Sequence, residues 1–92
     1  MPDKAVHMIV HGRVQGVGFR FFVRDQAAPH GIKGWVKNLP NGTVEIFAGG
    51  EKENLDNFIK VVNKGPFLGY VSELTLEWVE PTDSYTDFRI NF

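Results

Sequence analysis

Apolar and polar residues alternate near both ends of the chain, a pattern typical of β-strands that pack one face against a core. In residues 6–11 the apolar side is formed by Val6, Met8 and Val10. In residues 70–80 one side of the strand carries Leu74, Leu76 and Trp78. Residues 87–92 predict a short last strand whose inward side chains are Phe88, Ile90 and Phe92.

Two further strands are predicted in the middle of the chain, over residues 34–39 (GWVKNL) and 43–49 (TVEIFAG). Pro40, Asn41 and Gly42 lie between them. An Asn-Gly pair supplies the positive φ angles that a tight hairpin turn requires, so we expect these two strands to pair antiparallel.

Two segments show the spacing of an amphipathic helix. In the first, apolar residues recur at Phe19, Phe22, Val23 and Ala27. In the second, positions i, i+3, i+4 and i+7 are Leu55, Phe58, Ile59 and Val62. We expect Pro29 and Gly31 to end the first helix early and Lys64-Gly65-Pro66 to end the second, because glycine caps a helix and proline cannot continue it.

The predicted order is β-α-β-β-α-β followed by a short β-strand, which is the order of the split β-α-β arrangement. Each helix has one apolar stripe and each strand one apolar side, and this suits two layers around one core. The sequence therefore predicts an α+β, ferredoxin-like sandwich, in which an antiparallel sheet of four to five strands carries two helices on one face. We expect a single domain over residues 1–92.

Composition narrows the range of functions. The formal net charge is −1, so no overall positive field attracts nucleic acid or an anionic membrane. Cysteine is absent, which excludes disulfides, thiolate metal sites and a cysteine nucleophile. The first ten residues lack the apolar run of a signal peptide, and no segment is long enough to span a membrane. We expect a cytoplasmic monomer without nucleic-acid or membrane partners.

The segment from Gly12 to Phe22, GRVQGVGFRFF, connects the first strand to the first helix and contains no acidic residue. Glycines allow successive N–H groups to turn toward one side and form a nest for an anion, and a helix start adds partial positive charge. Arg20 lies in the first helical turn, and its guanidinium suits a phosphate or carboxylate. These residues alone leave two interpretations open: an oxyanion cradle, or a glycine-rich turn with a solvated arginine.

Two other ligand classes fit the same segment poorly. A dinucleotide fingerprint requires a third glycine where Phe21 stands, and a parallel β-α-β unit that is not predicted here. An RNA-recognition motif has the same element order, but its aromatic residues lie on the third strand. Here the aromatic run precedes the first helix, so we reject both alternatives.

The motif GRVQGVGFR, followed by GWVKN, NGTVE, KGP and DFRI, resembles the acylphosphatase family, and the resemblance runs from Val6 to Phe92. It implies hydrolysis of the carboxyl-phosphate bond of acyl phosphates, without a metal or organic cofactor. The resemblance places the phosphate among the loop residues Gln15, Gly16, Val17, Gly18, Phe19 and Arg20. It implies that Arg20 binds the phosphate and that Asn38 orients the attacking water. The alternative is a phosphate- or carboxylate-binding module of the same fold that has lost turnover.

Other polar and aromatic residues receive structural interpretations. His7 and His11 lie two apart on the outward side of the first strand, but no third ligand is near, so we expect a polar strand face. His30 is expected to be solvated at a helix end. Trp35 lies on the side opposite Val36 and is expected on the open face of the sheet.

Overall fold

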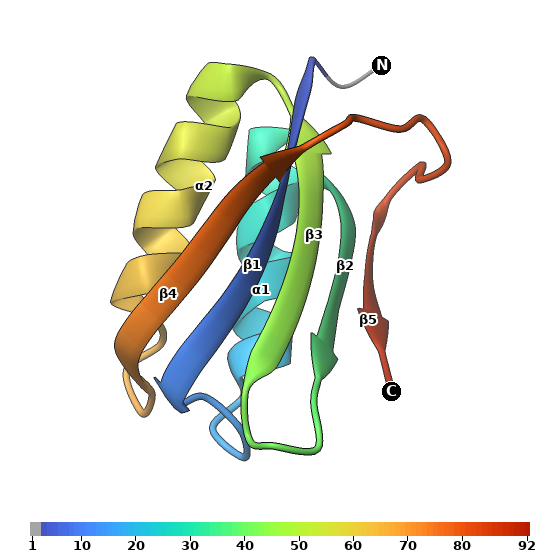
Figure 1. Cartoon of the computed structure of the whole chain (residues 1–92). Coiled ribbons are helices and arrows are strands. Elements are labelled where there is room, and N and C mark those ends of the chain that lie inside the picture. The colour runs from blue at the N-terminus through green and yellow to red at the C-terminus, as the bar shows by residue number, and fades with distance from the viewer. Residues whose placement is uncertain (1–2) are drawn as a thin grey trace.

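The computed structural model describes residues 3–92 and contains a five-stranded sheet with two helices on one face (Figure 1). The strands are β1 (Lys4–Arg13), β2 (Lys33–Asn38), β3 (Val44–Gly50), β4 (Tyr70–Val79) and β5 (Phe88–Asn91). The helices are α1 (Phe19–Ala27), a 3₁₀ turn η1 (Ala28–His30) and α2 (Lys52–Lys64). The predicted order of elements is therefore confirmed. The prediction that the first ten residues are not a signal peptide includes residues 1–2, which lie outside the described residues.

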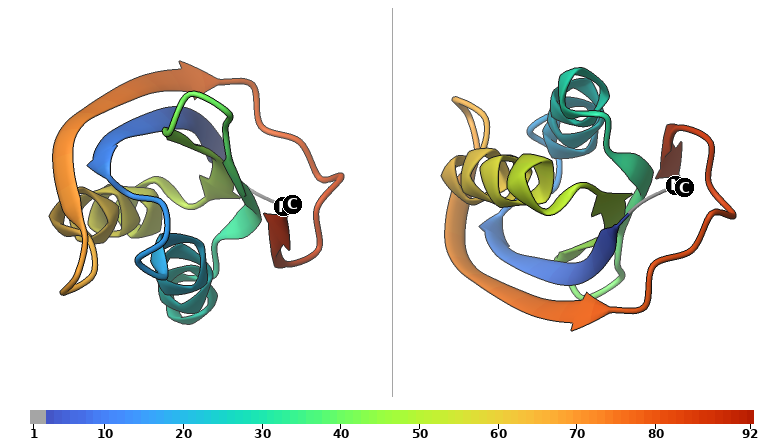
Figure 2. Two further views of the ribbon diagram at one scale, coloured as in Figure 1. Left: turned by 90° about the horizontal axis from the view of Figure 1, so that it is seen from below. Right: turned by 90° about the horizontal axis from the view of Figure 1, so that it is seen from above.

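The strands are arranged in the order β4-β1-β3-β2-β5. The pairs β1–β4, β1–β3 and β2–β3 are antiparallel, but β5 runs parallel to β2. The predicted antiparallel sheet is thus confirmed for β1 to β4, and the prediction is wrong only for β5. The reason is the connection between β4 and β5, which passes from one edge of the sheet to the other (Figure 2). It also reverses the direction of the chain, so that the arrows of β4 and β5 point in opposite directions in Figure 1.

The core lies between the sheet and the two helices. The predicted inward residues of β1 are fully buried, as are the main residues of the two helical stripes. Buried members of the core include Val6, Met8, Val10, Phe19, Val23, Ala27, Leu55, Phe58 and Val62. Helix α1 ends at Ala27 and Pro29 lies in the 3₁₀ turn, so the first helix is short, as expected.

The two edges of the sheet are more exposed than the alternation suggested. On β4, Leu76 and Trp78 pair with core-facing residues of β1, yet they are 36% and 43% exposed because β4 is an edge strand. Phe88 is buried and Ile90 packs against the core, whereas Phe92 is 92% exposed. The prediction that Phe92 points inward is wrong, because β5 ends at Asn91 and no strand holds the following residue against the core.

The β2–β3 hairpin closes with a different turn from the one predicted. Gly42 has a φ of 91°, but Asn41 does not have a positive φ. Leu39 N–H donates to the Thr43 carbonyl, and Gly42 N–H donates to the Leu39 carbonyl. This is a three-residue connection, favoured because proline fits the first position of a type I turn. Asn41 stabilises it by accepting hydrogen bonds from the backbone and side chain of Thr43.

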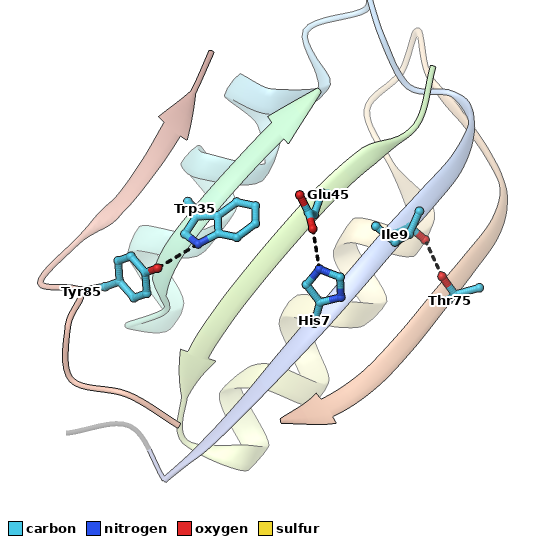
Figure 3. Close-up of polar contacts among 6 residues, drawn as sticks. All are labelled: His7, Ile9, Trp35, Glu45, Thr75 and Tyr85. Atoms are coloured by element: carbon cyan, nitrogen blue, oxygen red, sulfur yellow. Dashed lines mark hydrogen bonds and ion pairs between the residues drawn. The ribbon is translucent and has the colours of Figure 1, made fainter. Parts of the chain in front are cut away.

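The face of the sheet without helices is partly covered by the connection between β4 and β5. Trp35 Nε1 donates to the Tyr85 hydroxyl at 3.1 Å (Figure 3). The rings of Trp35 and Tyr85 both pack against Phe47. Trp35 therefore lies on the open face, as predicted, but it is engaged within the molecule. His7 and Glu45 pair at 2.8 Å on the same face.

Replacing Tyr85 by phenylalanine is expected to lower the free energy of unfolding by about 1 kcal/mol, because the partly buried indole N–H of Trp35 loses its hydrogen-bond acceptor. Urea denaturation measures this value. The control is Tyr70→Phe, since Tyr70 is 66% exposed. An equal change in both variants would contradict a stabilising role for the Trp35–Tyr85 contact.

Candidate functional site

The loop between β1 and α1, the start of α1 and the end of β2 meet at one end of the sheet (Figure 1). A pocket of about 230 Å³ opens there. It is lined by Val14, Gly16, Gly18, Phe19, Arg20, Phe21 and Asn38. Residues that are distant in the sequence thus form one concave site.

The loop has the backbone geometry of an anion nest. Gly16 and Gly18 have φ values of 74° and 76°, in the left-handed region that favours glycine. A Cβ at either position would meet no atom within 4 Å, so backbone conformation, not lack of space, accounts for glycine there. No side chain caps the start of α1, and its first turn contains no acidic residue. The first amides of the helix are therefore available to an anion.

Arg20 supplies the positive charge of the pocket. Its side chain is partly buried, and its guanidinium carbon lies 4.9 Å from the centroid of the Phe92 ring. Within residues 3–92, Arg20 forms no ion pair with a carboxylate. Arg24, one turn later, is instead exposed, pairs with Asp25 and lies over Phe21. Of these two arginines on α1, Arg20 is thus the one whose charge is not neutralised by an acidic neighbour.

Asn38 is the last residue of β2 and shares the inward side with Val36. Its Oδ1 atom is buried and has no hydrogen-bond partner. In the part of the chain that the structure describes, no other buried side-chain nitrogen or oxygen lacks a partner. Buried polar atoms are almost always satisfied, so this oxygen stands out as an unused hydrogen-bond acceptor on a residue that lines the pocket.

The structure brings five of the seven predicted site residues to the pocket: Gly16, Gly18, Phe19, Arg20 and Asn38. The other two, Gln15 and Val17, do not line it. The Gln15 side chain donates to two backbone carbonyls of the β2–β3 hairpin, and Val17 packs against the core.

Sequence reasoning did not single out Phe21, which is 49% exposed at the pocket wall. A signal was present, since Phe21 is an apolar residue outside the buried stripe of α1. The proximity of Phe92 to Arg20 had no comparable signal, because the two residues lie at opposite ends of the sequence.

The remaining candidates are engaged elsewhere. His7 pairs with Glu45, and no group of three His, Cys, Asp or Glu side chains placed to hold a metal occurs among residues 3–92. His30 is partly buried and its Nδ1 bonds to the Gln26 carbonyl at 2.8 Å, so the expectation of a solvated histidine is wrong. In the described residues, no helix is long and apolar enough to cross a membrane.

Comparisons with known proteins point to one family. The sequence model of the family described as Acylphosphatase matches residues 6–90. A protein named Acylphosphatase from Chlorobaculum tepidum is 42% identical over 90 residues, which cover 98% of each chain. The crystal structure of acylphosphatase from Bacillus subtilis matches with a TM-score of 0.93 and 36% identity, over 97% of this chain and 99% of that chain.

The same fold also occurs within a larger protein. The crystal structure of full-length HypF, in a phosphate- and nucleotide-bound form, matches with a TM-score of 0.89 and 33% identity. That match covers 100% of this chain but 12% of HypF. The family model and the similarity to relatives of nearly equal length lead to one conclusion: this chain belongs to the acylphosphatase family, whose function is the hydrolysis of acyl phosphates.

Proposed function

We propose that this chain hydrolyses the carboxyl-phosphate bond of acyl phosphates at the pocket between the β1–α1 loop and the end of β2, without a metal or organic cofactor. The observation that carries this proposal is the pairing of two unlike groups in one small pocket. Arg20 offers a cation to the phosphate, and Asn38 offers a buried oxygen that lacks a partner. These two groups meet the separate needs of an anionic substrate and an attacking water.

The phosphate oxygens accept hydrogen bonds from the amides of residues 15–20 and from the Arg20 guanidinium. Gly16 and Gly18 support this role through their left-handed backbone, and the uncapped start of α1 adds the dipole of the helix. A guanidinium donates two parallel bonds to one phosphate, which fixes orientation as well as charge. The site therefore holds the phosphorus atom in a defined position.

Asn38 positions the water for attack on phosphorus. Its Oδ1 accepts a hydrogen bond from the water, whose oxygen attacks opposite the carboxylate leaving group. The bond between phosphorus and the acyl oxygen breaks, and the carboxylate departs with the electron pair. A neutral amide is too weak a base to take the proton, so the proton passes to a phosphate oxygen. One acyl phosphate dianion and one water thus give one carboxylate and one dihydrogen phosphate, so that atoms and charge balance.

This chemistry asks little of acid-base groups. A carboxylate is a good leaving group, and the remaining work is positioning and charge stabilisation, the main protein contribution to phosphoryl transfer. The pocket lining fits that demand. Its side chains provide one cation and one amide, and none of the residues that line it, all in the described part of the chain, is an acid or a histidine.

The test is hydrolysis of benzoyl phosphate by the purified wild-type protein, with and without excess chelator. Turnover is measured as the decrease in the absorbance of the acyl phosphate. We expect the same rate in both conditions. Loss of activity with chelator, restored by a divalent metal, would contradict the proposed mechanism. A folded protein that binds inorganic phosphate but turns over no acyl phosphate would instead support the binding-module alternative.

We further propose that residues 1–92 form one acylphosphatase-like domain that acts as a monomer in the cytoplasm. Arg20 and Asn38, the two side chains that the proposed reaction uses, both come from this chain. The absence of cysteine fits a protein that does not rely on an oxidising compartment. Light scattering at the concentration of the assay tests the monomer, and a dimer mass would contradict it.

A further inference from the structure

The side chain of Gln15 connects the phosphate loop to the hairpin that follows Asn38. Its Nε2 donates to the carbonyls of Leu39 and Thr43, both at 2.8 Å. A carboxamide nitrogen carries two hydrogens, so both are used in these bonds. The donating end of the Gln15 side chain is therefore committed to the hairpin and is not free to bind phosphate.

The two accepting carbonyls belong to residues that are adjacent in sequence to Asn38 and to its partner on β3, Val44. Leu39 directly follows Asn38, and Thr43 directly precedes Val44, which is the register partner of Asn38. Gln15 itself directly precedes Gly16, a residue of the pocket lining. One side chain thus links the backbone next to the phosphate site with the backbone next to Asn38.

The strand order explains why such a link matters. β3 lies between β1 and β2, so sheet hydrogen bonds do not join the end of β1 directly to the end of β2. The phosphate loop leaves β1, whereas Asn38 ends β2. Val10 of β1 and Asn38 of β2 are both register partners of Val44, the first residue of β3, so β3 couples the two strands only up to this point. Beyond it, the sheet does not fix the phosphate loop relative to the hairpin. The Gln15 carboxamide spans this gap.

The hairpin does not need Gln15 for its own shape. Leu39 and Thr43 already pair through the backbone, and Asn41 accepts two hydrogen bonds from Thr43. The Gln15 bonds come in addition to this local network. Their effect is on the placement of the hairpin relative to the loop.

We propose that Gln15 is a positioning residue, which holds Asn38 at the distance from the phosphate loop that an in-line water requires. This inference rests on the proposed role of Asn38 in water attack. Misplacement of a reacting group by about 1 Å costs on the order of 10²-fold in rate, so loss of this link affects turnover more than phosphate binding.

The test uses Gln15→Met, a neutral variant of similar length that removes both donors. Its matched control is Gln26→Met, the same change at the other glutamine of the chain, on α1 and outside the pocket lining. We expect Gln15→Met to lower kcat for benzoyl phosphate by about 10- to 100-fold. The inhibition constant of inorganic phosphate is expected to change by less than about twofold, because Arg20 and the loop amides remain. The control is expected to leave both values unchanged.

A double-mutant cycle with Asn38→Ala separates positioning from a general structural role. If Gln15 acts through Asn38, Gln15→Met lowers kcat little further once Asn38 is absent, and the two effects are strongly non-additive. An equal factor in both backgrounds, or an unchanged kcat in Gln15→Met alone, would overturn the inference. An inactive wild type would instead refute the proposed function, and this inference with it. Should Gln15→Met fail to fold, Gln15→Asn, whose shorter side chain keeps the amide, is judged by the same criteria.

Discussion

Replacing Asn38 by alanine is expected to lower kcat for benzoyl phosphate by about 10²- to 10³-fold, while inorganic phosphate still binds. The physical reason is that the Oδ1 atom of Asn38 is buried at the pocket and has no protein partner. A water held there has a defined direction of attack, and without the amide it loses that direction. The phosphate keeps its contacts with Arg20 and the loop, so its inhibition constant is expected to change by less than about threefold.

The stability of Asn38→Ala provides a second, independent readout. A buried oxygen without a partner costs stability and does not add to it, so Asn38→Ala is expected to lower the free energy of unfolding by no more than about 1 kcal/mol. Urea denaturation measures it, with Asn63→Ala as a control at an exposed position on α2. A large loss of stability, or equal losses of turnover and phosphate affinity, would show that Asn38 is structural.

Replacing Arg20 by lysine is expected to lower kcat/KM by about 10²- to 10³-fold and to weaken binding of inorganic phosphate by at least about tenfold. The variant keeps the positive charge, so this effect isolates the geometry of the guanidinium. Lysine presents a single flexible ammonium, whereas arginine offers two parallel donors to one phosphate. Initial rates and phosphate inhibition, measured on the same preparation, test both parts.

The matched control for this experiment is Arg24→Lys. Arg24 lies one helical turn from Arg20 but is exposed, pairs with Asp25 and does not line the pocket. Its replacement is expected to change kcat/KM by less than about threefold, because it removes no contact with the phosphate. If Arg20→Lys retained nearly full activity, the site would need only net positive charge, and the proposed two-bond contact would be wrong.

Much of the candidate site is recognisable from local sequence. The glycines at 16 and 18, with Arg20 two residues after the second, are compatible with an anion nest at a helix start, although the residues alone leave a glycine-rich turn as the alternative. The structure gives both glycines a left-handed backbone. The alternation of Val36 and Asn38 predicts the side of β2 on which the amide lies, and the pocket lining confirms it. These features depend only on the spacing of residues that are close together in the chain, and this spacing is visible in the sequence itself.

The errors fall at residues whose neighbours the spacing of apolar and polar residues does not specify. The apolar residue Phe92 was expected in the core, but it follows the last paired residue and lies against Arg20. His30 was expected to be solvated, yet the short 3₁₀ turn brings it back to the Gln26 carbonyl. In each case the sequence shows which type of residue is present, but it does not show which atoms that residue contacts.

The sequence by itself determined the order of the elements, the buried side of each strand and helix, and the family motif, because these follow from periods of two and 3.6 residues and from local turn chemistry. Only the tertiary structure decided that β5 runs parallel to β2, that the Asn38 oxygen lacks a partner, and that Gln15 spans the phosphate loop and the hairpin. These features arise from strand order, which brings together atoms that are far apart in the sequence. Periodicity carries no information about which distant carbonyl a side chain will meet, so that choice belongs to the packed fold.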